Sequence, residues 1–252
     1  MSDAQESPAQ DDSGVEMDEK PSPKYKFSDA LRSRTIKIIT TQGAEFYVHE
    51  ELLCRESERF KKQLRGDFKE VKTGEITDFD ECPELLGMFF EYLYRDGPLH
   101  DEHLNHGYEF RILARLYCMA ERLSAKAFQD TVFWKFQTLF HLNYLVDELE
   151  IFQTLVILHT ELPEKKRTDY PLRRLALWWT ASRLSNLKKT AYFKRLILEY
   201  YPELASQLLM LVEAVPEDPK PYFPSVDPTP RFEVEVKFAK EAAKLHKPAK
   251  WG

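Results

Sequence analysis

The spacing of apolar and polar residues predicts a β-hairpin that leads into helices. Residues 35–40 are rich in β-branched side chains, as is typical of a strand. Gln42 and Gly43 supply a turn, and the alternation over 44–48 predicts a second strand that returns along the first. At 49–53 the pattern becomes helical. A small sheet is therefore expected near the start of the folded chain.

More helices and a third strand are expected after the hairpin. Ser57 is placed to cap a helix that Gly66 ends, and 75–79 has the pattern of a short strand after a polar loop. Pro83 opens the next helix. A helix expected over 108–123 is apolar around most of its circumference, which is typical of a central core helix. This order predicts an α+β fold, in which helices cover a small sheet.

The pattern divides the chain into four parts. Ser124 is expected to cap the last long helix of the α+β domain, which we place at residues 27–141. Apolar residues at helical spacing then predict an all-helical extension over 142–213. Residues 1–26 are mostly small, polar and acidic and predict a disordered tail. Residues 214–252 begin with a Pro-rich linker and end in a predicted amphipathic helix.

Composition narrows the class of protein. The 252 residues are 43% hydrophobic and 31% charged, as in globular proteins large enough to fold without disulfides. There is no apolar run of about 18 residues, so we expect no membrane span. The start of the chain is acidic and has no apolar core, so we expect no secretory signal. Three cysteines make no disulfide framework, and we expect an intracellular protein of the cytoplasm or nucleus.

Charge is distributed unevenly along the chain. The net charge is −6, and seven acidic residues against two lysines give residues 1–24 a charge of −5. Residues 164–195 reverse the balance, with ten Lys or Arg against two acidic residues. Such a stretch can contact nucleic-acid phosphates, or it can be a solvated helix surface that pairs with an acidic partner. The overall acidity does not favour nucleic acid as the main partner. The candidate basic-face residues are Lys165, Lys166, Arg167, Arg173 and Arg174.

Short motifs follow one another in a fixed order through the α+β part. In chain order they are IKII (36–39), FYVH (46–49), LL (52–53), SERF (57–60), FKE (68–70), Ile76, FFEYLY (89–94) and LYCMAERL (116–123). In this order the motifs resemble those of a BTB/POZ domain, over about 105 of the 252 residues. The predicted all-helical extension (142–213) resembles the C-terminal extensions of many fungal BTB/POZ proteins. The resemblance implies a BTB/POZ-like domain with a helical extension.

The resemblance also implies a class of function. BTB/POZ domains are protein–protein interaction modules that form homo- or hetero-oligomers, and many are adaptors that bind a cullin scaffold of a ubiquitin ligase. Cullin-binding members often carry an apolar residue, any residue and an acid after the serine-containing helix. Phe68, Lys69 and Glu70 stand there and are the candidate cullin contacts. The alternative is that Phe68 folds back onto the domain and Glu70 is solvated.

The chain departs from the family pattern at two sites. Members commonly have Ser-Asp before the first strand, where this chain has Arg34-Thr35, and often have Lys after the junction His, where it has Glu50. The Asp helps to shape a charged dimer pocket in some members, so its absence weakens the expectation of that mode of dimerisation. We expect the junction residue, His49, to be structural and to bond backbone groups where strand becomes helix.

No residue pattern predicts catalysis. His100, His103 and His106 are metal-capable, but no cysteine or further histidine completes a tetrahedral site, and we expect a polar loop there. The eight glycines form no phosphate-binding loop, and no nucleophile motif occurs. We therefore predict a protein that is not an enzyme, with no cofactor, no metal and no membrane association, whose partners are other proteins.

Overall fold

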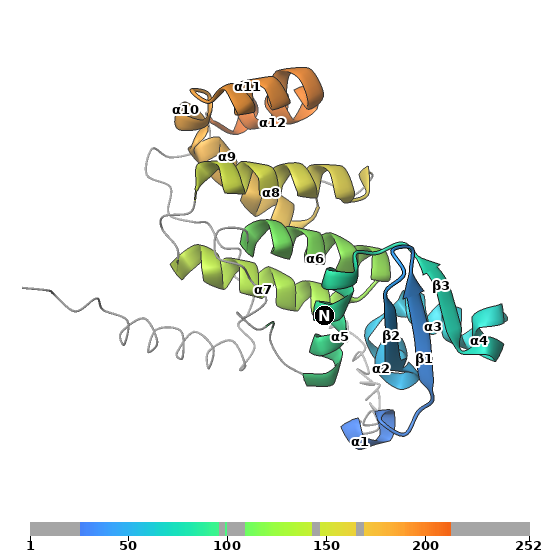
Figure 1. Cartoon of the computed structure of the whole chain (residues 1–252). Coiled ribbons are helices and arrows are strands. Elements are labelled where there is room, and N and C mark those ends of the chain that lie inside the picture. Colours follow the sequence, from blue (N-terminus) through green and yellow to red (C-terminus); the bar gives the residue numbers. More distant parts are fainter. Residues whose placement is uncertain (1–25, 96–98, 100–108, 143–146, 165–168, 213–252) are drawn as a thin grey trace, which may run out of the picture.

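The structure is a computed structural model of the chain (Figure 1). The residues that it describes are 26–95, 99, 109–142, 147–164 and 169–212. The acidic tail, the His-containing loop, the Pro-rich linker and the expected terminal helix lie outside the described residues.

A three-stranded sheet lies at one end of the molecule. The strands are β1 (Thr35–Thr40), β2 (Glu45–His49) and β3 (Glu75–Phe79). Their order is β2-β1-β3, with β1 antiparallel to β2 and parallel to β3. Gly43 has φ +82° in the hairpin turn, where glycine avoids the steric cost of a side chain. Ile36, Ile38 and Val48 are buried on the covered side. The strand pairing confirms the predicted hairpin and the predicted third strand.

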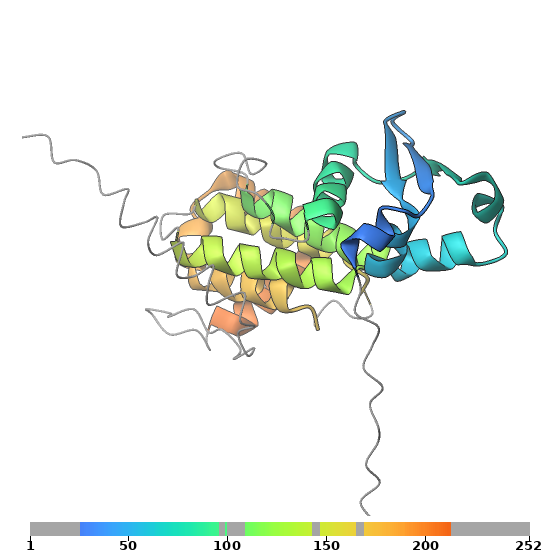
Figure 2. The ribbon, with the colours of Figure 1, turned by 90° about the horizontal axis from the view of Figure 1, so that it is seen from below.

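Helices make up most of the rest, so the coarse prediction of an α+β fold is confirmed. The helical segments before residue 96 are α1 (Phe27–Ala30), α2 (Glu50–Glu56), α3 (Glu58–Arg65), α4 (Lys69–Thr73) and α5 (Pro83–Arg95). Those that follow are α6 (Glu109–Leu123), α7 (Lys126–Leu142), α8 (Glu148–Glu161), α9 (Pro171–Ser182), α10 (Leu184–Leu187), α11 (Ala191–Arg195), the π-helical segment η3 (Leu196–Tyr200) and α12 (Pro202–Val212). Figure 2 shows the long helices side by side, leading away from the sheet.

Two serines expected to be caps behave differently. The Ser57 hydroxyl accepts a hydrogen bond from the Phe60 N–H at 3.2 Å, so Ser57 caps α3 as predicted. It also donates to the Leu123 carbonyl and so joins α3 to α6. The prediction that Ser124 caps α7 is wrong. Ser124 has φ +52°, and its N–H donates to Glu121 where α6 ends, so the chain reverses there and Ala125 precedes α7.

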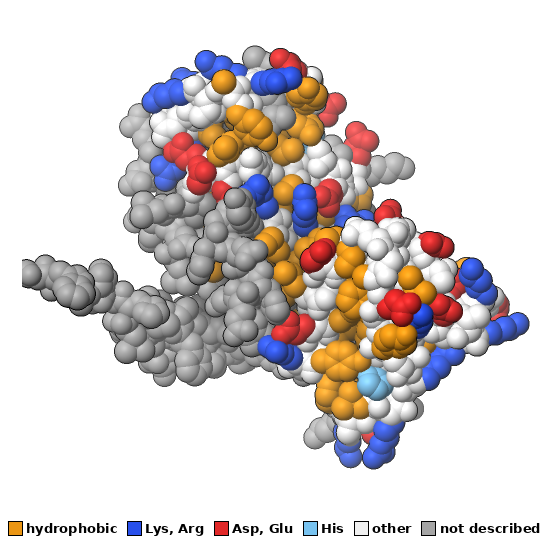
Figure 3. Space-filling model, in the orientation of Figure 1, with side chains coloured by type: hydrophobic (Ala, Val, Ile, Leu, Met, Phe, Trp, Pro, Cys, Tyr) orange, Lys and Arg blue, Asp and Glu red, His pale blue; other side chains and the backbone are white. Residues whose placement is uncertain are grey.

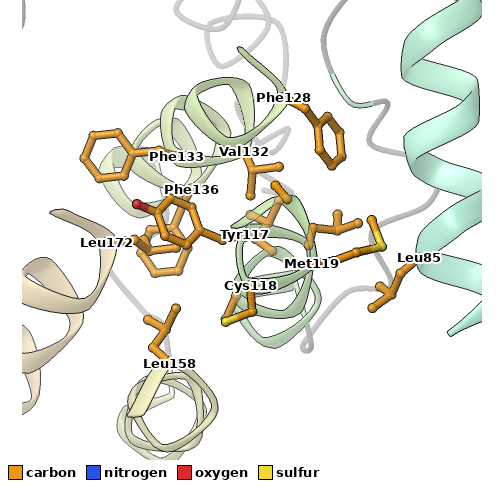
Figure 4. Close-up of a cluster of buried hydrophobic side chains, with 14 of the residues drawn as sticks. Leu85, Tyr117, Cys118, Met119, Phe128, Val132, Phe133, Phe136, Leu158 and Leu172 are labelled. Atoms are coloured by element: carbon orange, nitrogen blue, oxygen red, sulfur yellow. The ribbon is translucent and has the colours of Figure 1, made fainter. Parts of the chain in front are cut away.

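The predicted central helix is α6. Nine of its 15 residues are buried, and it packs against α7 on one side and α8 on another. Figure 4 shows Tyr117, Cys118 and Met119 of α6 among buried side chains of α5, α7, α8 and α9. The helices α8 and α9 pack on each other, and α12 packs on α9. One continuous apolar core therefore runs from the sheet into the helical half.

An ion-pair cluster fastens α6 to elements on both of its sides. Arg122 Nε and Nη2 each donate to a Glu81 carboxylate oxygen at 2.8 Å, and Nη1 donates to Glu161 at 3.3 Å. The bonds to Glu81 raise the pKa of Arg122, so the guanidinium stays charged. Glu81 lies just before α5, and Glu161 is the last residue of α8. Arg122 therefore connects the part of the chain that carries the sheet with the helices that follow α6.

Candidate functional site

The three candidate cullin contacts lie on the turn from α3 into α4, which we call the Phe68 knuckle (residues 66–74). Phe68 has extended backbone just before α4 and is 57% exposed. Lys69 is exposed and Glu70 is half-buried. The Phe68 ring lies over Gly66, where an added Cβ would come within 3.1 Å of it and within 2.7 Å of the Lys62 carbonyl. Phe68 is therefore outside the core, held on a backbone that requires glycine.

The helix α4 was not predicted, because the expected structure here was a polar loop. Gly74 ends it with φ +67°, a conformation that favours glycine. Arg34 Nη1 donates to the Val71 carbonyl at 2.6 Å, and its Nε is paired with Glu50. Arg34 and Glu50 are therefore partners, and through the bond of Arg34 to Val71 they support the knuckle.

The Glu70 carboxylate has no hydrogen-bond or ion-pair partner in the described part of the chain. It lies in the first turn of α4, next to the exposed Lys69. Phe68 and Glu70 together place an exposed apolar ring and a carboxylate without a described partner on a short element that Arg34 supports.

The edge strand β2 carries a second exposed aromatic residue that the sequence did not single out. Tyr47 is 61% exposed, its hydroxyl donates to Glu45 at 3.2 Å, and Lys37 Nζ lies 6.0 Å from its ring centre. Lys37 and Glu45 are paired at 2.8 Å, and this hydrogen bond raises the pKa of Lys37 and lowers the pKa of Glu45. Charged groups thus flank this edge, which is a common protection against strand pairing.

The ring of the junction residue His49 bonds a side chain of α5, and among the described residues it makes no bond to the backbone. The Tyr94 hydroxyl accepts from the His49 backbone N–H at 3.1 Å and bonds the ring Nδ1 at 2.8 Å. The two rings meet edge to face. The hydroxyl of Tyr94, which lies on α5, therefore holds the point where β2 ends and α2 begins.

The structure describes two of the five candidate basic-face residues, Arg173 and Arg174. Lys165, Lys166 and Arg167 lie outside the described residues, and Arg174 is exposed. The placement of Arg173 on a solvated face is wrong, because Arg173 is 1% exposed. Its Nη2 donates to Gln207 at 2.7 Å and lies 3.3 Å from His159 Nδ1, so α9 uses it to bind α8 and α12.

Exposed Lys and Arg side chains lie instead beside α10 and on α11, among the last helices that the structure describes. Figure 3 shows Lys and Arg side chains over α10 and α11. The exposed residues there are Arg183, Lys188, Lys189, Lys194 and Arg195. Tyr192, also on α11, is 46% exposed, so a basic surface with one aromatic ring is available to a partner.

A groove that sequence reasoning missed lies between α7, α9 and α12. It has a volume of about 690 Å³ and mainly apolar walls, which include Phe133, Trp178 and Met210. These residues are far apart in the sequence, and each fits an ordinary helical pattern. No local signal therefore indicated that their side chains share one groove.

The described residues contain no group of three or more His, Cys, Asp or Glu side chains that could hold a metal ion. In the same part of the chain, no helix combines the length and the apolar character needed to cross a membrane. No protein-family model and no curated protein matches this chain.

Proposed function

We propose that this chain is a protein–protein interaction module of BTB/POZ type that acts as an adaptor or scaffold for a cullin-based ubiquitin ligase. The motif order supports the BTB/POZ assignment, and the small helix-covered sheet is compatible with it. The observation that carries the proposal is that Phe68 is 57% exposed on a turn that Arg34 holds in place. Two residues later, the Glu70 carboxylate has no partner among the described residues. An adaptor of this class works inside the cell, in the cytoplasm or nucleus.

The mechanism is surface complementarity. A partner helix with an apolar pocket removes the exposed part of the Phe68 ring from water, and a basic side chain beside that pocket pairs with Glu70. Buried aromatic anchors of this kind contribute about 2 kcal/mol or more to binding, a change of about 30-fold in Kd. Because the knuckle is braced by Arg34, little ordering is needed when the partner binds.

The test is cullin co-purification with the full chain and with the double variant Phe68→Ala, Glu70→Lys. Tyr200→Ala with Glu203→Lys is the matched control, because it removes another exposed aromatic residue and another exposed acid. Loss of cullin from the Phe68 variant alone supports the proposal. Absence of cullin from the unmodified chain, or equal loss from both variants, contradicts it.

A second candidate function is nucleic-acid association. The exposed Arg183, Lys188 and Lys189 beside α10, the exposed cations of α11 and the exposed Tyr192 favour it. Retention on nucleic acid should then fall steeply with salt and disappear when Lys188 and Lys189, together with Lys165, Lys166 and Arg167, are changed to Glu. Retention that survives these changes excludes this function.

A further inference from the structure

The groove between α7, α9 and α12 exposes apolar surface to water. Leu175 and Trp178 of α9 line it with Met210 and Leu211 of α12, and Met210 is 81% exposed. Its volume of about 690 Å³ is in the usual range of ligand sites, about 300–1,000 Å³. A contiguous apolar surface that is exposed to water commonly marks a site where a ligand or another segment binds.

A buried polar group also points to an occupant. Gln137 of α7 lines the groove and is 4% exposed, yet its Oε1 has no hydrogen-bond donor among the described residues. A buried acceptor without a donor costs about 1–3 kcal/mol. An occupant that brings an N–H or O–H group into the groove removes this cost.

We propose that the groove holds residues 215–224 of this same chain, with Tyr222 and Phe223 as the inserted side chains. The helix α12 forms one wall and ends at Val212, so the chain leaves from the rim of the groove. Ten residues in extended polyproline conformation reach about 30 Å, which is ample for a return path.

The chemistry of this segment matches the groove. Its sequence is VPEDPKPYFP, and its four prolines favour an extended conformation of the kind that docks in aromatic-lined grooves. Tyr222 carries both an aromatic ring and a hydroxyl that can donate to Gln137 Oε1. Glu217 and Asp218 are opposite in charge to Arg174, which is exposed at the groove.

Self-occupation has a regulatory consequence that is independent of the Phe68 knuckle. A short tether holds the segment at a local concentration on the order of 1 mM. An outside ligand must therefore compete with the chain's own segment, and release of the segment opens the groove.

The first test places the photo-crosslinker p-benzoylphenylalanine at Phe223 in the full chain, with Phe238 as the matched control position. We expect crosslinks within one molecule from position 223 to Met210, Trp178 or Leu175, and none of these from position 238. The proposal is overturned by crosslinks to other parts of the chain, by none at all, by crosslinks between two copies, or by the same groove crosslinks from both positions.

The second test measures binding of a labelled peptide of residues 213–226. The full chain with Tyr222→Ser and Phe223→Ser should bind it about 100-fold more tightly than the unmodified chain, because its groove is open. Adding Met210→Asp should abolish binding, whereas adding Leu209→Asp should not, since Leu209 is 64% exposed and does not line the groove. Equal binding to both chains, or no binding to the opened chain, overturns the proposal.

Discussion

The sheet-bearing half (residues 26–95) and the helical part (residues 109–212) place their charged residues differently. In the first, ion pairs such as Arg65–Glu51 lie at the surface, with side chains 49% and 41% exposed. In the second, Arg173 and Glu150 are buried among packed helices. Exposed pairs contribute little to stability, whereas a buried charge destabilises the protein unless its partners are in place. Ion pairs inside the sheet-bearing half are therefore partly or fully exposed, whereas the buried charged residues Glu81, Glu150 and Arg173 lie against helices of the helical part.

The largest effect is expected where the two halves meet. Arg122→Leu leaves Glu81, whose side chain is 3% exposed, without its bidentate partner. The free energy of unfolding should fall by about 3 kcal/mol, measured by urea denaturation. Arg65→Leu is the control and should cost less than about 1 kcal/mol. Equal costs would remove the distinction between the two kinds of ion pair.

Neighbouring arginines on α9 give a sharper comparison. Arg173→Lys replaces the guanidinium group that reaches Gln207 and His159 with a single ammonium group. The free energy of unfolding should fall by about 2 kcal/mol. Arg174→Lys changes an exposed side chain and should alter stability by less than about 0.5 kcal/mol. Thermal unfolding of both variants checks this, and similar midpoints would mean that Arg173 does not fasten α9.

The sheet-bearing half has its own buried polar fastening at Ser57. Ser57→Ala removes the cap of α3 and the bond to the Leu123 carbonyl, and we expect a loss of about 1 kcal/mol. Ser206→Ala, which removes an exposed hydroxyl bonded to Pro202, should cost less. Chemical denaturation distinguishes them, and an unchanged Ser57→Ala protein would contradict the assigned role.

The smallest effect concerns the pH dependence of stability. Burial raises the pKa of Glu150 above its ordinary value of 4.5, and the nearby Arg111 charge only partly opposes this. Because Glu150 holds its proton more tightly in the folded state than in the unfolded state, its contribution to the free energy of unfolding falls as pH rises above 4.5. Glutamine does not titrate, so the stability of Glu150→Gln relative to the unmodified protein should increase from pH 5 to pH 7. A difference that stays constant with pH would show that Glu150 titrates normally.

Local chemistry was enough to predict much of the fold. Alternating β-branched residues gave β1, the hydroxyl of Ser57 gave the start of α3, and the apolar circumference of residues 109–123 gave the central helix. The five-residue α4 has no apolar period, and it is held by Arg34, which lies 37 residues before its partner Val71. Such long-range bonds leave no local pattern.

The same limit explains the errors at the candidate sites. Arg173 was placed in solvent because charge usually indicates surface, but α9 is covered by α8 and α12. Phe68, Lys69 and Glu70 could be named as candidates because their motif is contiguous in the sequence, and their role stays a prediction. The groove was missed because its walls come from three separate helices.

The central claim is that the Phe68 knuckle is the anchor of a protein interface. Titration of purified cullin into the full chain and into Phe68→Ala measures this directly. We expect saturable binding that becomes about 30-fold weaker when the ring is removed. Equal affinities, or no binding to the unmodified chain, would contradict the claim.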